Sequence, residues 1–85
     1  MTFSPRNMTD KIHISQARKM LDSGQPVSLT FVKRTNGAIV HAEDVVSLRY
    51  DFYTGMRTIK FLRTGQKRSI HDALIIGIND FEVFL

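Results

Sequence analysis

Turn signals recur at short intervals along this chain, and short apolar segments lie between them. The signals are the dipeptides Asn36-Gly37, Thr54-Gly55, Thr64-Gly65 and Asn79-Asp80. This spacing is typical of an antiparallel meander, because a tight turn is the shortest connection between two paired strands. Asn36-Gly37 is the strongest of them, since both central residues of a type I′ turn need a positive φ. The pattern therefore predicts a mainly β domain built from successive hairpins.

The segments between these turns alternate between apolar and polar residues. Val27, Leu29 and Phe31 show this period of two, which indicates a strand with one buried face. We expect strands near 27–34, 38–42, 45–50, 56–62, 67–70, 74–78 and 81–85, of which 67–70 could also begin a crossover. Residues 42–44 interrupt the alternation and predict a bulge or bend. Val46, Leu48 and Tyr50 are expected on one face of the segment that follows.

A short helix is expected before the first of these strands, over residues 15–22. Its apolar residues Ile14, Ala17, Met20 and Leu21 form one stripe at helical spacing. Ser15 is the predicted N-cap, and Gly24 and Pro26 end the helix. A helix of about two turns is unstable alone and has to pack on the sheet.

These elements predict a single small domain over residues 11–85, preceded by an irregular arm over residues 1–10. In this domain a short N-terminal helix is followed by an antiparallel meander of about five strands. A sheet this small has exposed edges unless it closes, and closure removes them. We therefore expect the meander to close into a small SH3-like or OB-like barrel.

Composition excludes several classes of protein. The chain has no cysteine, which excludes disulfides, zinc–thiolate sites and thiol nucleophiles. No apolar run approaches the roughly 20 residues of a membrane helix, and the first ten residues lack the apolar region of a signal peptide. We therefore expect no membrane partner and a location in the cytoplasm of the producing cell, or in a virion. A chain of 85 residues also buries only a small core, which favours oligomerisation.

The net charge of +4 is concentrated between Phe52 and His71, a window that contains no acidic residue. Its basic residues are Arg57, Lys60, Arg63, Lys67 and Arg68, which we call the basic strip. Basic groups bind phosphates and an aromatic ring such as Tyr53 can stack on a base, so these six residues are candidate contacts to nucleic acid or another anion. The alternative interpretation is a solvated hairpin whose basic side chains cover apolar surface and protect a sheet edge, or a protein interface.

Catalytic and metal sites are not indicated. His41 is close in sequence to Glu43 and Asp44, and His71 precedes Asp72, but neither group has the spacing of metal ligands. The serines lack a nucleophile motif and the glycines do not form a phosphate-binding loop. We therefore expect a protein that is not an enzyme and that holds no cofactor or metal.

The C-terminal segment is apolar on both faces of its expected strand, through Phe81, Val83, Phe84 and Leu85. These side chains belong either to the core or to an edge strand that adds to the sheet of a neighbouring subunit. The second interpretation makes them candidate oligomer contacts.

Five segments carry a resemblance to a known group of proteins. They are Ile14-Ser15-Gln16-Ala17, Gly24-Gln25-Pro26-Val27, Val46-Ser47-Leu48-Arg49-Tyr50, Gly65-Gln66-Lys67-Arg68 and Ile78-Asn79-Asp80-Phe81-Glu82-Val83. Through them the chain resembles short uncharacterised proteins encoded by phages, prophages and mobile elements of gut bacteria of the Bacteroides type. The resemblance implies a small non-enzymatic protein of a virion or of its assembly, and it assigns no residue a role.

Three functions follow as expectations. The first is a non-catalytic, phage-like structural or assembly protein that acts through protein–protein contacts, as a homo-oligomer or in a larger particle. The second is a nucleic-acid-binding barrel that uses the basic strip. The third is a binder of a small anionic ligand, such as a nucleotide signal.

Overall fold

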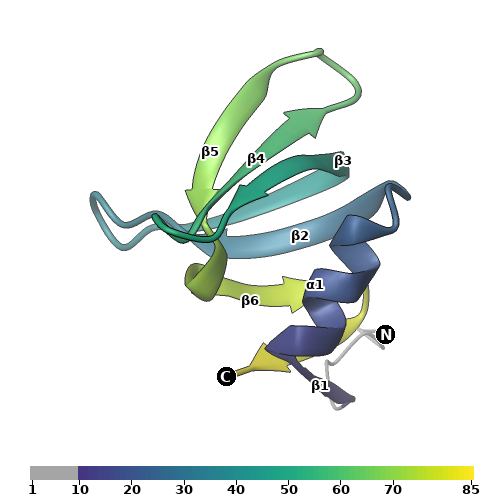
Figure 1. Cartoon of the computed structure of the whole chain (residues 1–85), viewed down its shortest axis with the longest axis vertical. Helices are drawn as coiled ribbons and strands as arrows, with labels where there is room; N and C mark the ends of the chain where they lie inside the picture. The colour runs from purple at the N-terminus through teal and green to yellow at the C-terminus, as the bar shows by residue number, and fades with distance from the viewer. Residues whose placement is uncertain (1–9) are drawn as a thin grey trace, which may run out of the picture.

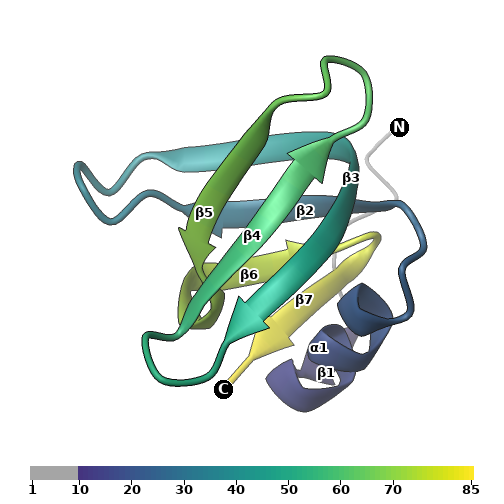
Figure 2. The same cartoon turned by 45° about the horizontal axis from the view of Figure 1, so that its top comes forward.

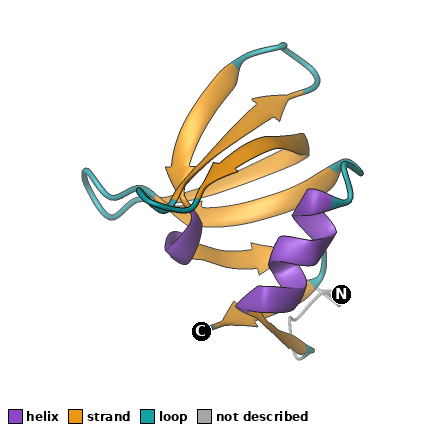
Figure 3. Ribbon diagram, in the orientation of Figure 1, coloured by secondary structure: helices purple, strands orange, loops and turns teal. Residues whose placement is uncertain are grey.

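The computed structural model describes residues 10–85, and the secondary structure of this part is mainly β (Figures 1 and 3). The elements in chain order are β1 Lys11–His13, α1 Ile14–Asp22, β2 Val27–Val32, β3 Ile39–Asp51, β4 Met56–Phe61, β5 Lys67–His71, the 3-10 turn η1 Asp72–Leu74, β6 Ile75–Ile78 and β7 Phe81–Phe84. The strands form one sheet in the order β1-β7-β6-β2-β3-β4-β5. This confirms a β-rich domain with one α-helix, in which β2 to β5 form an antiparallel meander.

The described sheet is open, so the expected closed barrel is not confirmed. β1 and β5 lie at its two ends and do not pair with each other. After β5 the chain turns through η1, and β6 pairs with β2 on the side away from β3. β7 then adds to the outside of β6. In Figure 2 the ribbons of β4 and β5 pass in front of β2 and β6, so the sheet is strongly curled although it does not close.

Three hairpin turns share one geometry, which their sequences explain. The glycines Gly37, Gly55 and Gly65 have φ of 73°, 72° and 76°. Each donates its N–H to the carbonyl oxygen four residues earlier, at 2.8, 2.8 and 2.7 Å. A left-handed φ is costly for residues with a Cβ, so glycine is the residue that fits here.

The residue before each of these glycines reinforces the turn. The side-chain oxygens of Asn36, Thr54 and Thr64 each accept the backbone N–H two residues ahead, at 3.0, 3.3 and 3.2 Å. Asn36 itself does not have a positive φ. The predicted type I′ turn is therefore wrong, although the hairpin is confirmed. The reason is that the loop is longer than two residues, so only its last residue needs the left-handed conformation.

The helix begins one residue earlier than expected, at Ile14. His13, and not Ser15, is the N-cap, and its Nδ1 accepts the N–H of Ser15 at 3.1 Å. At the other end Gly24 has a φ of 82°, and its N–H donates to the carbonyl of Leu21. The predicted stop at Gly24 is thus confirmed.

The two strands expected at 38–42 and 45–50 are one long strand, β3, with irregularities inside it. Asp44 has a φ of 56°, and the pairing with β2 shifts between Val27 and Leu29, so the predicted bulge is confirmed. A second shift lies between Ser47 and Arg49 and was not expected. As a result Val46 lies opposite Lys60 and Tyr50 lies opposite Arg57, two residues on opposite faces of β4. The expected common face of Val46, Leu48 and Tyr50 is therefore wrong.

The core lies between α1 and the curled sheet. It consists of Ile14, Ala17, Leu21, Val27, Leu29, Phe31, Val45, Ile59, Ile70, Ile75, Ile78 and Val83. Met20 and Phe61 pack against this core. Three of the core residues come from α1, so the apolar stripe that predicted the helix is also the face that attaches it.

Sequence reasoning missed β1, which pairs in parallel with β7. Its three residues are too few to show a period, and their place in the sheet depends on a partner at the far end of the chain. Of the arm predicted for residues 1–10, only Asp10 is described, and its carbonyl accepts the N–H of Glu82 at 2.9 Å. The rest of that prediction lies outside the described residues.

Candidate functional site

The basic strip is divided between the two faces of the sheet. In β4 and β5, Arg57 lies opposite Ile70 and Ile59 opposite Arg68, so both arginines belong to the face that carries the core. Lys60 lies opposite Lys67, one register position away, and therefore on the outer face. The structure thus does not bring the five side chains together.

Arg57 is buried, with 1% of its surface exposed. Its Nε donates to Oδ1 of Asp72 at 2.6 Å, and its Nη1 donates to Asp22 at 3.0 Å and to Ser47 at 2.8 Å. The Tyr50 ring lies 4.9 Å from its guanidinium carbon. Arg57 is therefore an internal residue, and its predicted role as a contact to an external anion does not fit this position.

Asp72 is the centre of this buried cluster and is 1% exposed. Its second oxygen accepts from Nε of Arg18 on α1, so one carboxylate joins the helix to β4. This hydrogen bond raises the pKa of the Arg18 guanidinium above its usual value, and Arg18 stays charged at any pH used for proteins. Sequence reasoning missed this role because no pattern distinguishes Asp72 from an exposed acid beside His71.

Arg63 lies on the surface, with 69% of its side chain exposed, but it already has acidic neighbours. Its Nε donates to Asp44 at 2.9 Å, and its Nη2 lies 3.5 Å from Glu43. These acids precede the predicted acid-free window in sequence, and the β3–β4 pairing brings them beside it. The local charge around Arg63 is therefore balanced or negative.

The outer face of β3, β4 and β5 keeps a smaller basic patch. Arg49 lies opposite Thr58, and Thr58 opposite Ser69, next to the pair of Lys60 and Lys67. Like charges directly opposite each other on a sheet are destabilising. An anion bound between the two lysines would remove this repulsion. We call Arg49, Lys60 and Lys67 the outer basic patch.

Tyr53 and Phe52 form the tip of the β3–β4 turn and are 94% and 79% exposed. Their rings meet edge to face at 5.9 Å. The turn leads into β4 at Met56, whereas Lys60 is near the other end of that strand. The predicted combination of Tyr53 with the basic strip is therefore not assembled in one place.

A groove of about 270 Å³ lies beside β5, and we call it the β5 groove. It is lined by Phe31, Val32, Lys33, Arg34, Thr35, Met56, Arg68, Ser69, Ile70 and His71. Phe31 and Ile70 are core residues that provide its apolar floor, while Lys33, Arg34 and Arg68 bring positive charge. Arg68 also lies 5.8 Å from the Phe61 ring.

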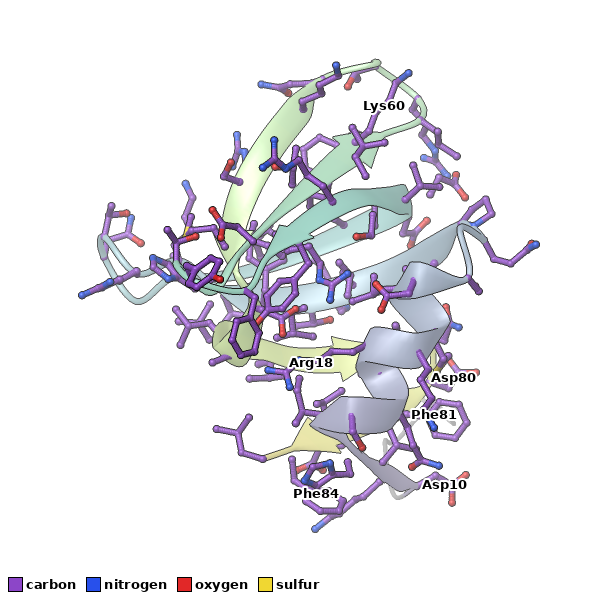
Figure 4. The ribbon with its side chains drawn as sticks, viewed as in Figure 1. Asp10, Arg18, Lys60, Asp80, Phe81 and Phe84 are labelled. Atoms are coloured by element: carbon purple, nitrogen blue, oxygen red, sulfur yellow. The ribbon has the colours of Figure 1, made fainter. Side chains whose placement is uncertain are left out.

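The C-terminal residues lie at the opposite end of the sheet. Val83 is buried and Phe81 is half-buried, whereas Phe84 and Leu85 are 47% and 74% exposed. The Phe84 ring meets His13 of β1 edge to face at 5.4 Å. Figure 4 shows Phe84 beside β1 at one end of the molecule and Lys60 at the other. Of the four predicted oligomer contacts, Phe84 and Leu85 are the two with exposed side chains.

The three histidines lie on different elements or at different ends of them. His13 caps α1, and Nδ1 of His41 lies 2.6 Å from Oγ1 of Thr30. Within residues 10–85 no group of three or more histidine, aspartate or glutamate side chains is arranged to hold a metal ion. No helix in the same range is long and apolar enough to cross a membrane.

The fold and these surfaces define a small β-rich domain with a buried ion-pair cluster, a basic patch and, within residues 10–85, two sheet edges without a further strand. Comparison with protein-family models, with curated proteins and with solved structures gave no match.

Proposed function

We propose that this chain is a non-catalytic protein that acts through protein–protein contacts, as a homo-oligomer or as one part of a larger assembly such as a phage particle. The observation that carries this proposal is the edge strand β1, which pairs on one side only within residues 10–85, together with Phe84 and Leu85, which are exposed at the end of the adjacent β7. An edge strand offers backbone hydrogen bonds to another chain, and exposed apolar side chains add to the stability of such a contact.

The geometry at this edge favours association over solvation. β7 ends at Phe84, and the ring of this residue lies against His13 of the edge strand. Two adjacent large apolar side chains are thus exposed one strand inside the β1 edge, where a subunit that adds to β1 and covers this face could bury them. Natural proteins usually protect edges with charge, bulges or covering segments. Lys11 places a charge at the start of β1, but at its other end His13 lies beside the exposed Phe84 and Leu85. That end of the edge is therefore suited to burial against another chain.

Light scattering after size-exclusion chromatography tests this proposal. We expect the wild-type protein to have a mass that is a multiple of 9.7 kDa and the variant Phe84→Ser/Leu85→Ser to be a monomer. Phe52→Ser/Tyr53→Ser is the matched control, because it removes an adjacent exposed apolar pair from the β3–β4 turn and should keep the wild-type mass. A wild-type monomer at high concentration that also recovers no protein partner from a particle would contradict the proposal.

A second function, binding of nucleic acid, is favoured by the outer basic patch. Lys60 and Lys67 repel each other across two strands, and binding of a phosphate backbone would relieve this repulsion. The hydroxyl groups of Thr58 and Ser69 lie at the next register position. Arg57 is excluded from this surface by burial and Arg63 by its two acids.

This second function predicts weak binding of single-stranded DNA that depends on salt. Three neutralised phosphates would give a slope of about −2 for the logarithm of the association constant against the logarithm of salt concentration. Replacing Arg49, Lys60 and Lys67 by alanine should abolish binding, whereas Arg63→Ala should leave it unchanged. Fluorescence anisotropy with labelled oligothymidine measures both effects. No binding at low salt rules out this function.

A further inference from the structure

The open edge of β5 has backbone groups that point away from the sheet. In an antiparallel ladder, hydrogen-bonded pairs alternate with pairs whose backbone groups point outward. Phe61 donates to the carbonyl of Gln66 at 2.8 Å, and Asp72 donates to that of Gly55 at 2.9 Å, which sets this alternation along β5. Arg68 and Ile70 therefore bond to β4. Lys67, Ser69 and His71 direct their N–H and C=O groups toward the open side.

The β5 groove lies along this edge. Its lining includes Ser69 and His71, so the outward backbone groups border a surface that is already concave. Its floor is apolar because Phe31 and Ile70 lie beneath it. An added strand could bond to the edge with one side of its backbone and place alternate side chains into the groove. β5 has five residues, a length of about 16 Å, so an extended segment of about five residues fits it.

The charge of the side chains that line the β5 groove indicates which kind of segment would bind there. Among the described residues, those that line the groove include Lys33, Arg34 and Arg68 and no aspartate or glutamate. Lys67 lies on the same edge strand. An acidic segment would be complementary to this lining, and opposite charges across an interface favour both association rate and specificity.

A second copy of this chain fits the groove less well. The other edge of the sheet formed by residues 10–85 is β1, which carries Lys11 and His13, and β5 itself carries Lys67 and Arg68. Pairing of β5 with either edge of another copy would place positive charges side by side, which is destabilising.

We propose that the β5 groove binds an extended acidic segment of a partner protein, which adds to β5 as an eighth strand of the sheet. This inference rests on the proposed function in protein–protein contacts and names a second contact site, separate from Phe84 and Leu85. The basic side chains then do more than protect the edge from unwanted pairing. They select the charge of the strand that pairs there.

Fluorescence anisotropy with a labelled peptide of alternating glutamate and valine tests the proposal. We expect this peptide to bind at least about tenfold more tightly than the matching peptide of lysine and valine. N-methylation of alternate peptide bonds on the edge that faces β5 should abolish binding, because strand addition needs those N–H groups. Equal binding of the two charge forms, or full binding of the N-methylated peptide, would overturn the proposal.

Protein variants separate the backbone contact from the charge contact. Ser69→Pro removes one N–H that points away from β4, and proline is tolerated at such edge positions. We expect it to lose peptide binding and to keep the wild-type circular dichroism spectrum. Lys33→Glu/Arg34→Glu should also lose binding, while Lys11→Glu/Lys19→Glu, the same charge change elsewhere on the surface, should retain it. Wild-type binding by folded Ser69→Pro would argue against strand addition.

The same experiments distinguish this inference from the function on which it rests. If the wild-type protein oligomerises through Phe84 and Leu85 but binds no acidic peptide, only the β5 proposal fails. If oligothymidine or a nucleotide binds where the peptide does not, the groove is an anion site and not a strand acceptor. If the protein is monomeric and recovers no partner yet binds the peptide, the β5 groove stands without the contact at the β1 edge.

Discussion

Replacing Asp72 by asparagine should lower the free energy of unfolding by about 3–5 kcal/mol, the usual cost of leaving a buried charge without its partner. Arg57 is 1% exposed, and its Nε lies 2.6 Å from Asp72. The amide of asparagine keeps the shape of the side chain but not its charge. A domain of this size has a total stability of about 4–13 kcal/mol, so the substitution is expected to remove a large fraction of it. Urea denaturation followed by circular dichroism measures the change.

Asp22→Asn is the matched control for this prediction. It removes a carboxylate from the same guanidinium, at 3.0 Å, but Asp22 has 66% of its side chain exposed. Water replaces an exposed partner at little cost, so we expect a loss of at most about 1 kcal/mol. Equal effects of the two substitutions would show that burial does not govern this cluster. In that case the ion pair to Asp72 would not be the main link between β4 and α1.

Leu21→Ala should lower the free energy of unfolding by about 2–5 kcal/mol, because it removes a large side chain from a closely packed core. Leu21 is 1% exposed and is one of three core residues that α1 contributes. A helix of nine residues is unstable by itself, so its attachment depends on these contacts. The measurement is again urea denaturation, with the helical signal and the tyrosine fluorescence followed separately.

Lys19→Ala is the control, since Lys19 is exposed on the same helix and alanine favours helix formation. It should leave stability nearly unchanged. If Leu21→Ala melts the helix while the tyrosine signal keeps its wild-type midpoint, then α1 is a separate unit. That result would contradict the view that Arg18 and Asp72 join the helix and sheet into one cooperative structure.

Local chemistry explains why the hairpins were predictable. Gly37, Gly55 and Gly65 each take a left-handed φ that few other residues adopt. Asn36, Thr54 and Thr64 add side-chain oxygens at the right distance along the chain. The helix was also predictable from local sequence. Its apolar stripe and the glycine that ends it, Gly24, all lie within about ten residues of the chain.

The candidate site was less predictable, because membership of a charged patch depends on which face of the sheet each residue occupies. The acid-free window placed Arg57 and Lys60 in one strip, but the register puts Arg57 in the core and Lys60 outside. Arg63 has no acidic residue near it in the sequence, but in the structure Asp44 of β3 lies beside it and accepts a hydrogen bond from its Nε. The lining of the β5 groove combines Arg34 with Arg68, which are far apart in the chain.

The sequence alone determined where this chain turns, which segments are extended, and that its one short helix needs a sheet to pack on. These properties follow from backbone conformation and from the alternation of apolar residues, and both act over a few residues. Only the tertiary structure decided that the sheet of residues 10–85 does not close, that β1 joins β7, and that Asp72 lies buried between two arginines. Those outcomes depend on contacts between residues distant in sequence, and such contacts leave no local pattern.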